Sequence, residues 1–281
     1  MMSLKINTPL VSVDWLFSNL ENEHLIILDA TIPKVTSNDE AIGEKYQIKN
    51  ARFFDIQTIF SDINAPFPNT VLSPEEFEEN AQELGINNNS CIIVYDDLGM
   101  YSSPRVWWLF QLMGFKNIAV LNGGFPEWKK KEYPIEKPFS HQPKKGNFKV
   151  DYQPQKIKFT KDVLSAIEND KILIADARSK GRFYATEPEP RKGLKGGHIP
   201  NSISFPIADI IVDGKLKSAE KLKEIFKEKN PKNKEFIFSC GSGITAAVLA
   251  LGAEIAGYNK HAVYDGSWTE WASTENLPIE K

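Results

Sequence analysis

Cysteine is scarce in this chain, with Cys91 and Cys240 the only two among 281 residues. Two cysteines are too few for a disulfide framework or a cysteine-based zinc site, so we expect free thiols and a reducing, cytoplasmic setting. The chain also lacks any apolar run of about 18 residues, and its start lacks the features of a signal peptide, so we expect no membrane contact. Neither charge sign dominates, since 34 Lys and Arg face 37 Asp and Glu. This balance gives no electrostatic reason to expect nucleic-acid binding.

The chain does contain an internal duplication. LIILDA at 25–30 matches ILIADA at 172–177, and three residues near the end of each copy also match: Gly123, Glu127 and Trp128 with Gly266, Glu270 and Trp271. The offset of roughly 145 residues is the size of a domain, which indicates a tandem duplication. We predict a first, catalytically inactive domain over 1–136, a linker over 137–157 rich in Pro, Lys and Gln, and a second domain over 158–281.

Each copy alternates short, apolar, β-rich runs with helical patterns. In the second copy, KILIADA and EFIFSC are predicted strands, and SAEKLKEIFKEKN is a predicted helix that begins after Ser218. The Ala-rich TAAVLALGAEIAGY is predicted to be a further helix. This alternation is typical of an α/β fold in which helices flank a mostly parallel sheet.

Cys240 lies between the end of a predicted strand and the start of a helix at Thr245. Gly241 and Gly243 allow a tight turn, so the loop amides at Gly241, Gly243 and Ile244 are expected to line an anion site together with the helix N-terminus. A thiolate is such an anion and is the nucleophilic form of cysteine. The alternative is that Cys240 is a small buried apolar residue.

The first copy has no nucleophile at the matching position. Aligning CIIVYDDLGM with EFIFSCGSGI places Asp96 opposite Cys240. Cys91 opens its strand with no glycine loop behind it, so we predict that it is a core residue.

Two chemistries use a cysteine in a loop lined by amides. Hydrolysis of phosphate esters needs an arginine at the loop's end, where this chain has Ala246, and no Lys or Arg follows until Lys260. Sulfur transfer needs no metal or organic cofactor, because the cysteine itself carries the sulfur as a persulfide. The sequence therefore favours sulfur transfer.

The whole chain resembles the two-domain rhodanese family, the thiosulfate and 3-mercaptopyruvate sulfurtransferases. The resemblance rests on FFDI, PRVWWLF and VLNGGFPEW in the first copy, and on DARSKGRFYATEPEPRKGLKGGHIP and CGSGITA in the second. It implies a tandem duplication of a rhodanese-like domain. Gly241 and Ser242 after the cysteine are similar to the mercaptopyruvate branch, whereas the thiosulfate branch carries basic residues there. The implied acceptor is a thiol, cyanide or a thioredoxin-like protein. Thiosulfate as preferred donor, or a persulfide carrier without a small-molecule donor, are the alternatives.

The resemblance also implies site residues. Arginines at Arg182 and Arg191 bind the substrate carboxylate in the mercaptopyruvate branch, for which a planar guanidinium is suited. The alternative is that these arginines pair with Glu187 and Glu189, or are solvated.

Two hydroxyl residues follow Cys240 in the loop. Ser242 and Thr245 are expected to hydrogen-bond the keto group or the sulfur, with turn formation and helix capping as the alternative. The chain departs from the family at Gln57 and Asn69, where several mercaptopyruvate enzymes carry an acidic residue and a histidine. Neither replacement can act as a general base.

Overall fold

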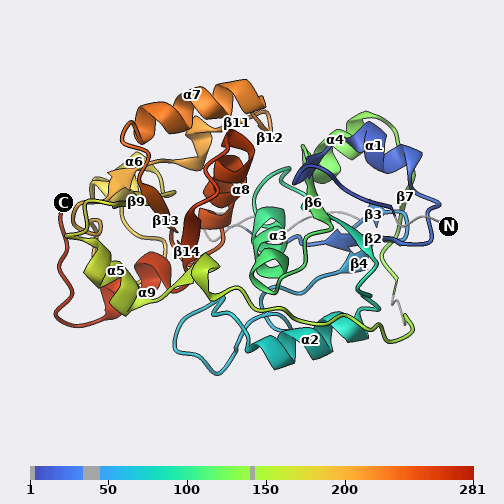
Figure 1. The fold of residues 1–281 in the computed structure, drawn as a ribbon, viewed down its shortest axis with the longest axis horizontal. Coiled ribbons are helices and arrows are strands. Elements are labelled where there is room, and N and C mark those ends of the chain that lie inside the picture. The colour runs from blue at the N-terminus through green and yellow to red at the C-terminus, as the bar shows by residue number, and fades with distance from the viewer. Residues whose placement is uncertain (1–3, 34–44, 140–142) are drawn as a thin grey trace. The chain divides into compact units, whose positions relative to one another are not determined.

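The computed structural model describes residues 4–33, 45–139 and 143–281, and the chain forms two compact α/β units (Figure 1). Unit 1 comprises residues 1–61, 72–152 and 213–215, and unit 2 comprises residues 62–71, 153–212 and 216–281. The short segment 62–71 therefore groups with the second unit, although it lies in the first half of the sequence.

Unit 1 is built on a five-stranded sheet in which every strand pair is parallel. The strand order is β1 (Leu10–Val11), β6 (Ile118–Leu121), β5 (Cys91–Tyr95), β2 (Leu25–Asp29) and β4 (Arg52–Phe53). Its helices are α1 (Val13–Ser18), α2 (Pro74–Glu83), α3 (Ser103–Leu112) and α4 (Gly124–Lys130). A short antiparallel pair joins β3 (Gln47–Ile48) to β7 (Ile135–Glu136).

Unit 2 repeats this plan. Its parallel sheet has the order β8 (Ile157–Lys158), β14 (His261–Tyr264), β13 (Glu235–Ser239), β9 (Ile172–Asp176) and β10 (Ile203–Ser204). Its α-helices are α5 (Thr160–Ala166), α6 (Lys180–Phe183), α7 (Ala219–Lys229), α8 (Ala246–Ala256) and α9 (Ser267–Ser273). Two 3-10 helices, η1 (Pro154–Lys156) and η2 (Ile207–Asp209), and the short strands β11 (Ile211–Val212) and β12 (Lys215–Leu216) complete the described elements.

The two sheets have the same strand order when each is read from its first strand in sequence. In both units the first strand is at one edge, and the strand before the key loop, β5 or β13, is in the centre. The predicted α/β duplication is thereby confirmed. Central strands of a sheet covered on both faces are apolar throughout, and all five residues of β5 are buried.

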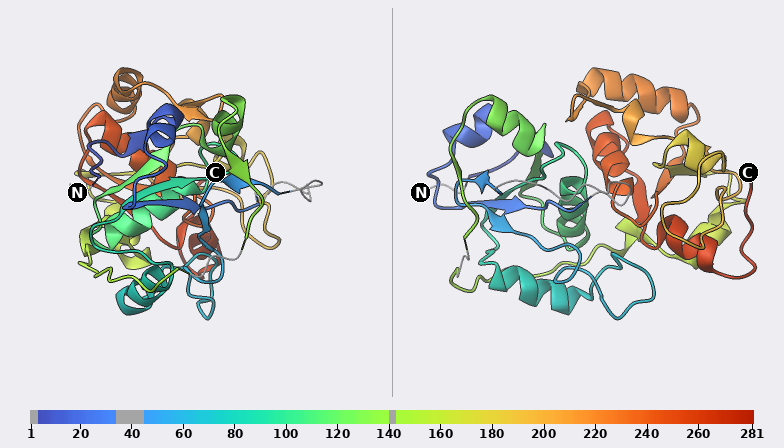
Figure 2. Two further views of the ribbon diagram at one scale, coloured as in Figure 1. Left: turned by 90° about the vertical axis from the view of Figure 1, so that its right-hand side faces the viewer. Right: turned by 180° about the vertical axis from the view of Figure 1, so that it is seen from behind.

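Helices α7 and α8 are neighbours, but different sequence features account for each helix. The Ser218 side chain caps α7 by accepting from the Lys221 N–H, as the sequence predicts. Helix α8 is mostly Ala, Leu and Val and is almost wholly buried. Gly252 allows close approach, since a Cβ there would lie 3.2 Å from the Phe226 ring. The two helices pack side by side, orange and dark red in Figures 1 and 2. No helix within the described ranges is long and apolar enough to span a bilayer.

The chain between the two repeats is packed against unit 1 for much of its length. The Phe148 side chain is fully buried, with ring contacts to Phe77, Phe110 and Phe115. The division between the two units falls after Tyr152. The boundaries 1–136, 137–157 and 158–281 stay a proposal for the limits of the duplicated domains, and residues 140–142 of that linker lie outside the described residues.

Candidate active site

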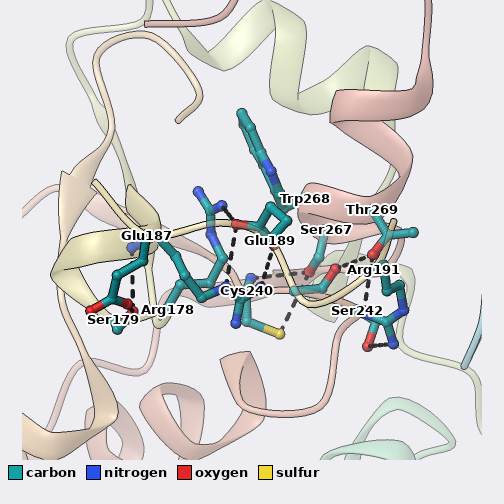
Figure 3. Close-up of polar contacts among 12 residues, drawn as sticks. Arg178, Ser179, Glu187, Glu189, Arg191, Cys240, Ser242, Ser267, Trp268 and Thr269 are labelled. Carbon is teal, nitrogen blue, oxygen red and sulfur yellow. Dashed lines mark hydrogen bonds and ion pairs between the residues drawn. The ribbon is translucent and has the colours of Figure 1, made fainter. Parts of the chain in front are cut away.

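Cys240 lies at the C-terminal end of β13, in the loop that leads into α8. We call residues 240–245 the cysteine loop. Cys240 is 1% exposed, and its Sγ lies 3.9 Å from the Ser267 Oγ, which can donate a hydrogen bond to it (Figure 3). Cys91 is different: it is fully buried in β5, and burial raises the pKa of its thiol to about 12. The prediction that Cys91 is a core residue is confirmed.

Ser267, the first residue of α9, forms hydrogen bonds with two backbone N–H groups of the cysteine loop. Its Oγ accepts hydrogen bonds from the backbone N–H groups of Cys240, at 3.1 Å, and Gly243, at 3.2 Å. The Ser267 hydroxyl proton has two acceptors in reach, the Tyr264 carbonyl at 2.9 Å and the Cys240 sulfur. Loop amides thus converge on a hydroxyl oxygen beside the sulfur, an arrangement that the sequence interpretation did not include.

Ser242 accepts hydrogen bonds from two other residues. Its Oγ accepts from the Asn69 Nδ2 at 3.0 Å and from the Arg191 Nη2 at 3.2 Å. The same Asn69 nitrogen donates to the Ser242 carbonyl at 3.1 Å, which fixes the orientation of the amide because a carbonyl can only accept. Asn69 belongs to segment 62–71, within unit 2. With both lone pairs of the Ser242 Oγ occupied, its own proton is directed away from Asn69 and Arg191.

Arg191 is held on a second side by α9. Its Nη1 donates to the Thr269 Oγ1 at 3.4 Å, and the Thr269 hydroxyl donates to the Gly241 carbonyl at 2.6 Å. The guanidinium is therefore fixed between the Ser242 hydroxyl and Thr269, at the edge of the cysteine loop (Figure 3).

Arg182 reaches the same loop but has a carboxylate partner. Its Nη2 lies 2.6 Å from the Glu189 Oε2. A Cβ on Gly241 would lie 3.1 Å from the Arg182 Nη2 and 3.8 Å from the Arg191 Nη1. Both predicted arginines therefore lie beside the residue that follows Cys240. The pairing alternative holds for Arg182 with Glu189, whereas the exposed Glu187 accepts from Ser179.

A buried arginine, Arg178, pairs with both Asp176 and Glu189. Arg178 binds Asp176 through its Nε and Nη2, and its Nη1 lies 2.7 Å from the Glu189 Oε1. Its guanidinium lies over the Trp268 ring, 4.3 Å from the centroid. Burial disfavours the charge, but the carboxylates of Asp176 and Glu189 outweigh it and raise the pKa of Arg178. This network fixes the position of Glu189.

Other sequence-predicted site residues have simpler surroundings. Thr245 precedes α8 but its side chain makes no capping hydrogen bond, so the capping alternative is wrong. Ile244 is buried, at 5% exposure. Gln57 is exposed in unit 1, and its N–H donates to Asp55.

The sequence interpretation missed Ser267 and Thr269. The repeat offered a signal, because NGGF in the first copy becomes DGSW in the second, which places Ser267 opposite Gly124. The two positions share a left-handed backbone, with φ of 51° at Ser267 and 52° at Gly124. A serine is unusual in that conformation, which marks the position as special.

The equivalent loop in unit 1 holds a carboxylate where unit 2 has the cysteine. Asp96 is fully buried, and its Oδ2 accepts from the N–H groups of Tyr101, Ser102 and Ser103 at 2.9 to 3.0 Å. The Ser103 hydroxyl donates to the same oxygen at 2.6 Å. In the first copy the loop therefore gathers four hydrogen-bond donors around one oxygen of the Asp96 side chain.

Comparison with known proteins identifies the family. The model of the rhodanese-like domain matches residues 12–131 and 159–274. The 3-mercaptopyruvate sulfurtransferase of Escherichia coli (strain K12) is 34% identical over 277 residues, with 97% of this chain and 98% of that protein covered. The thiosulfate sulfurtransferase of Mus musculus is 35% identical over 273 residues, with 93% and 91% covered. The crystal structure of SseA from Escherichia coli, a 3-mercaptopyruvate sulfotransferase, superposes with a TM-score of 0.83 at 32% identity, over 93% of this chain and 99% of that one.

The family match covers both repeats, and the relatives named here are sulfurtransferases over nearly the full length of this chain. This chain belongs to the two-domain rhodanese family of sulfurtransferases.

Proposed function

We propose that this enzyme moves sulfane sulfur from 3-mercaptopyruvate, through a persulfide on Cys240, to a thiol, cyanide or thioredoxin-like acceptor. The observation that carries the proposal is the convergence of Arg182 and Arg191 beside Gly241, next to Cys240. A small keto acid with one carboxylate has a cation to bind there, while its sulfur reaches the thiolate.

In the first half-reaction the Cys240 thiolate attacks the sulfur of the donor. A sulfur–sulfur bond forms, the carbon–sulfur bond of the donor breaks, and the electron pair leaves on the enolate of pyruvate. The enolate takes up the proton that the donor thiol releases. In the second half-reaction an acceptor nucleophile attacks the outer sulfur and Cys240 leaves as a thiolate.

The residues around the loop have separate tasks in this scheme. Arg191 binds the donor carboxylate through its planar guanidinium. The Ser242 proton, directed away from Asn69 and Arg191, donates to the keto oxygen and stabilises the developing enolate. The Ser267 hydroxyl and the helix N-terminus stabilise negative charge on the cysteine sulfur. Because a thiolate formed in this way needs no external base, Asn69 in place of a histidine is compatible with the reaction.

Thiosulfate is the second candidate donor, supported by the similarity to a thiosulfate sulfurtransferase. The two candidates differ in charge, since 3-mercaptopyruvate carries one carboxylate and thiosulfate is a dianion. The cysteine loop itself carries no basic residue, which favours the monoanion.

The donor is tested by steady-state kinetics with cyanide as acceptor. We expect kcat/KM for 3-mercaptopyruvate to exceed that for thiosulfate by about tenfold or more, because each extra unmatched charge in the site costs about that factor. The reverse order would assign thiosulfate as donor. Turnover with neither donor, combined with persulfide uptake from a cysteine desulfurase, would assign a carrier function.

Asn69 is proposed to hold Ser242 through a hydrogen bond that does not titrate. In Asn69→Ala the Ser242 hydroxyl and carbonyl each lose a donor, and we expect kcat/KM for 3-mercaptopyruvate to fall about tenfold. Asn64→Ala, on the same segment but exposed, is the control and should retain native kinetics. If the two variants have equal kinetics, Asn69 has no role in positioning Ser242 for catalysis.

Both cysteines are free thiols in the structure, although Cys91 and Cys240 differ in environment. A persulfide intermediate requires a reduced Cys240. We therefore propose that the enzyme works in a reducing, cytoplasmic compartment.

A further inference from the structure

We propose that segment 277–280 positions Arg182 for donor binding, and that His198 connects this segment to the arginine. This inference rests on the proposed function. His198 lies in the GGHIP stretch and has no part in the reaction scheme above, yet it is only 7% exposed. Buried polar groups need hydrogen-bond partners. The polar contacts of His198 lie on two elements, α6 and segment 277–280, so this residue joins the two.

Helix α6 carries Arg182 but is too short to fix it alone. It spans one turn, Lys180–Phe183, and an isolated helix of that length is not stable in water. The last carbonyls of a helix also have no partner within it. The His198 Nδ1 lies 3.0 Å from the Phe183 carbonyl oxygen, and it donates because a carbonyl can only accept. The His198 ring also stacks on the Phe183 ring, with centroids 3.9 Å apart, so His198 fixes the end of α6 directly after Arg182.

Segment 277–280 in turn fixes His198. The two form an antiparallel bridge, in which the His198 N–H donates to the Glu280 carbonyl at 2.8 Å and the Glu280 N–H donates to the His198 carbonyl at 3.0 Å. Gly197 permits this approach, because its φ is 129° and a Cβ there would overlap the Glu280 carbonyl oxygen. The Trp271 indole N–H donates to the Pro278 carbonyl at 2.8 Å, which anchors the segment to α9.

A second set of contacts leads from the bridge to Arg182. The Gly197 carbonyl accepts from the Arg178 Nη2 at 2.8 Å. Arg178 pairs with one oxygen of Glu189, and the other oxygen of Glu189 pairs with Arg182. Both sets of contacts end at one of the two arginines beside the cysteine loop. We therefore expect disruption of the bridge to weaken donor binding and to leave the later transfer of sulfur to the acceptor unchanged.

Two substitutions of His198 separate its hydrogen bond from its ring. His198→Phe keeps a ring against Phe183 but removes the donor to the Phe183 carbonyl, whereas His198→Asn keeps an N–H group close to the position of Nδ1 and loses the ring. We expect His198→Phe to raise the KM for 3-mercaptopyruvate about tenfold, and His198→Asn to stay within about threefold of the native KM. A KM for His198→Phe equal to or below that for His198→Asn would overturn the proposal.

Single-turnover kinetics separate positioning from a general loss of structure. Persulfide formation is measured by mixing the enzyme with 3-mercaptopyruvate, and persulfide discharge by mixing the loaded enzyme with dithiothreitol, a neutral thiol. In His198→Phe, loading at low donor concentration should be about tenfold slower. Discharge should keep its native rate constant, because the acceptor step needs no carboxylate binding. Equal slowing of the two half-reactions would mean that His198 has only a structural role.

Glu280→Pro tests segment 277–280 without shortening the chain. Proline removes the N–H that donates to the His198 carbonyl, whereas the control Glu280→Gln keeps it and changes only a side chain that is 57% exposed. We expect Glu280→Pro to slow loading about fivefold and Glu280→Gln to load at the native rate. Native loading by Glu280→Pro would refute the role of the segment, and this pair alone decides if His198→Phe does not fold. A native enzyme that forms no persulfide with either donor would instead refute the proposed function.

Discussion

Replacing Cys240 with serine is expected to lower kcat/KM with either donor by at least about a thousandfold. A serine hydroxyl at neutral pH is a poor nucleophile, and it cannot carry sulfane sulfur as a persulfide. The substitution changes one atom in a residue that is 1% exposed, so the fold should be kept. The measurement is steady-state cyanide-dependent turnover, with circular dichroism to establish that the variant is folded.

Cys91→Ala is the matched control for this result. Cys91 is buried in the other sheet with a pKa raised to about 12, so it cannot supply a thiolate, and its loss should leave kcat/KM near the native value. Mass spectrometry of the enzyme treated with donor alone should place the added sulfur on the peptide that contains Cys240. Turnover by Cys240→Ser, or sulfur on the Cys91 peptide, would refute the persulfide mechanism.

Replacing Arg191 with alanine is expected to raise the KM for 3-mercaptopyruvate about 30-fold. The expected loss is that of a charge-assisted hydrogen bond to the donor carboxylate, worth about 2 kcal/mol. The Ser242 Oγ also loses one of its two donors, so a smaller fall in kcat should accompany the change in KM. The measurement is a full substrate-saturation curve, which separates the two constants.

The neighbouring Lys192 provides the control for Arg191. It carries the same charge but is exposed, and Lys192→Ala should leave the KM within about twofold of native, as is usual for a screened surface charge. Arg191→Lys keeps the charge but loses the planar fork, so we expect an intermediate KM. A KM for Arg191→Ala no higher than that for Lys192→Ala would exclude carboxylate binding by Arg191.

Much of the fold could be predicted from the sequence because its signals are local. The apolar runs LIILDA and ILIADA form the equivalent strands β2 and β9, and Ser218 caps the helix that follows it. The repeat then fixes the common strand order. The packing of Phe148 against unit 1 was not predicted, because a single aromatic residue in a polar stretch has no periodicity to reveal which surface it covers.

The catalytic cysteine could be predicted from the sequence, whereas most of the hydrogen bonds and ion pairs around the cysteine loop could not. Cys240 follows a central strand, and the family resemblance adds Arg182 and Arg191. The contact between Asn69 and Ser242 joins residues 173 positions apart, so no local pattern could reveal it. The pairing of Glu189 with two arginines depends on the path of the loop after α6, which propensity does not determine.

The backbone of Ser267 connects the stability of this enzyme to its activity. A serine with φ of 51° carries an unfavourable conformation of about 1 to 3 kcal/mol, and the first copy avoids that cost with Gly124 at the same place. The second copy tolerates it because the Ser267 Oγ accepts hydrogen bonds from the N–H groups of Cys240 and Gly243, which glycine cannot do. Selection for thermostability alone would therefore favour glycine at position 267, and would weaken the sulfur site as the protein became more robust.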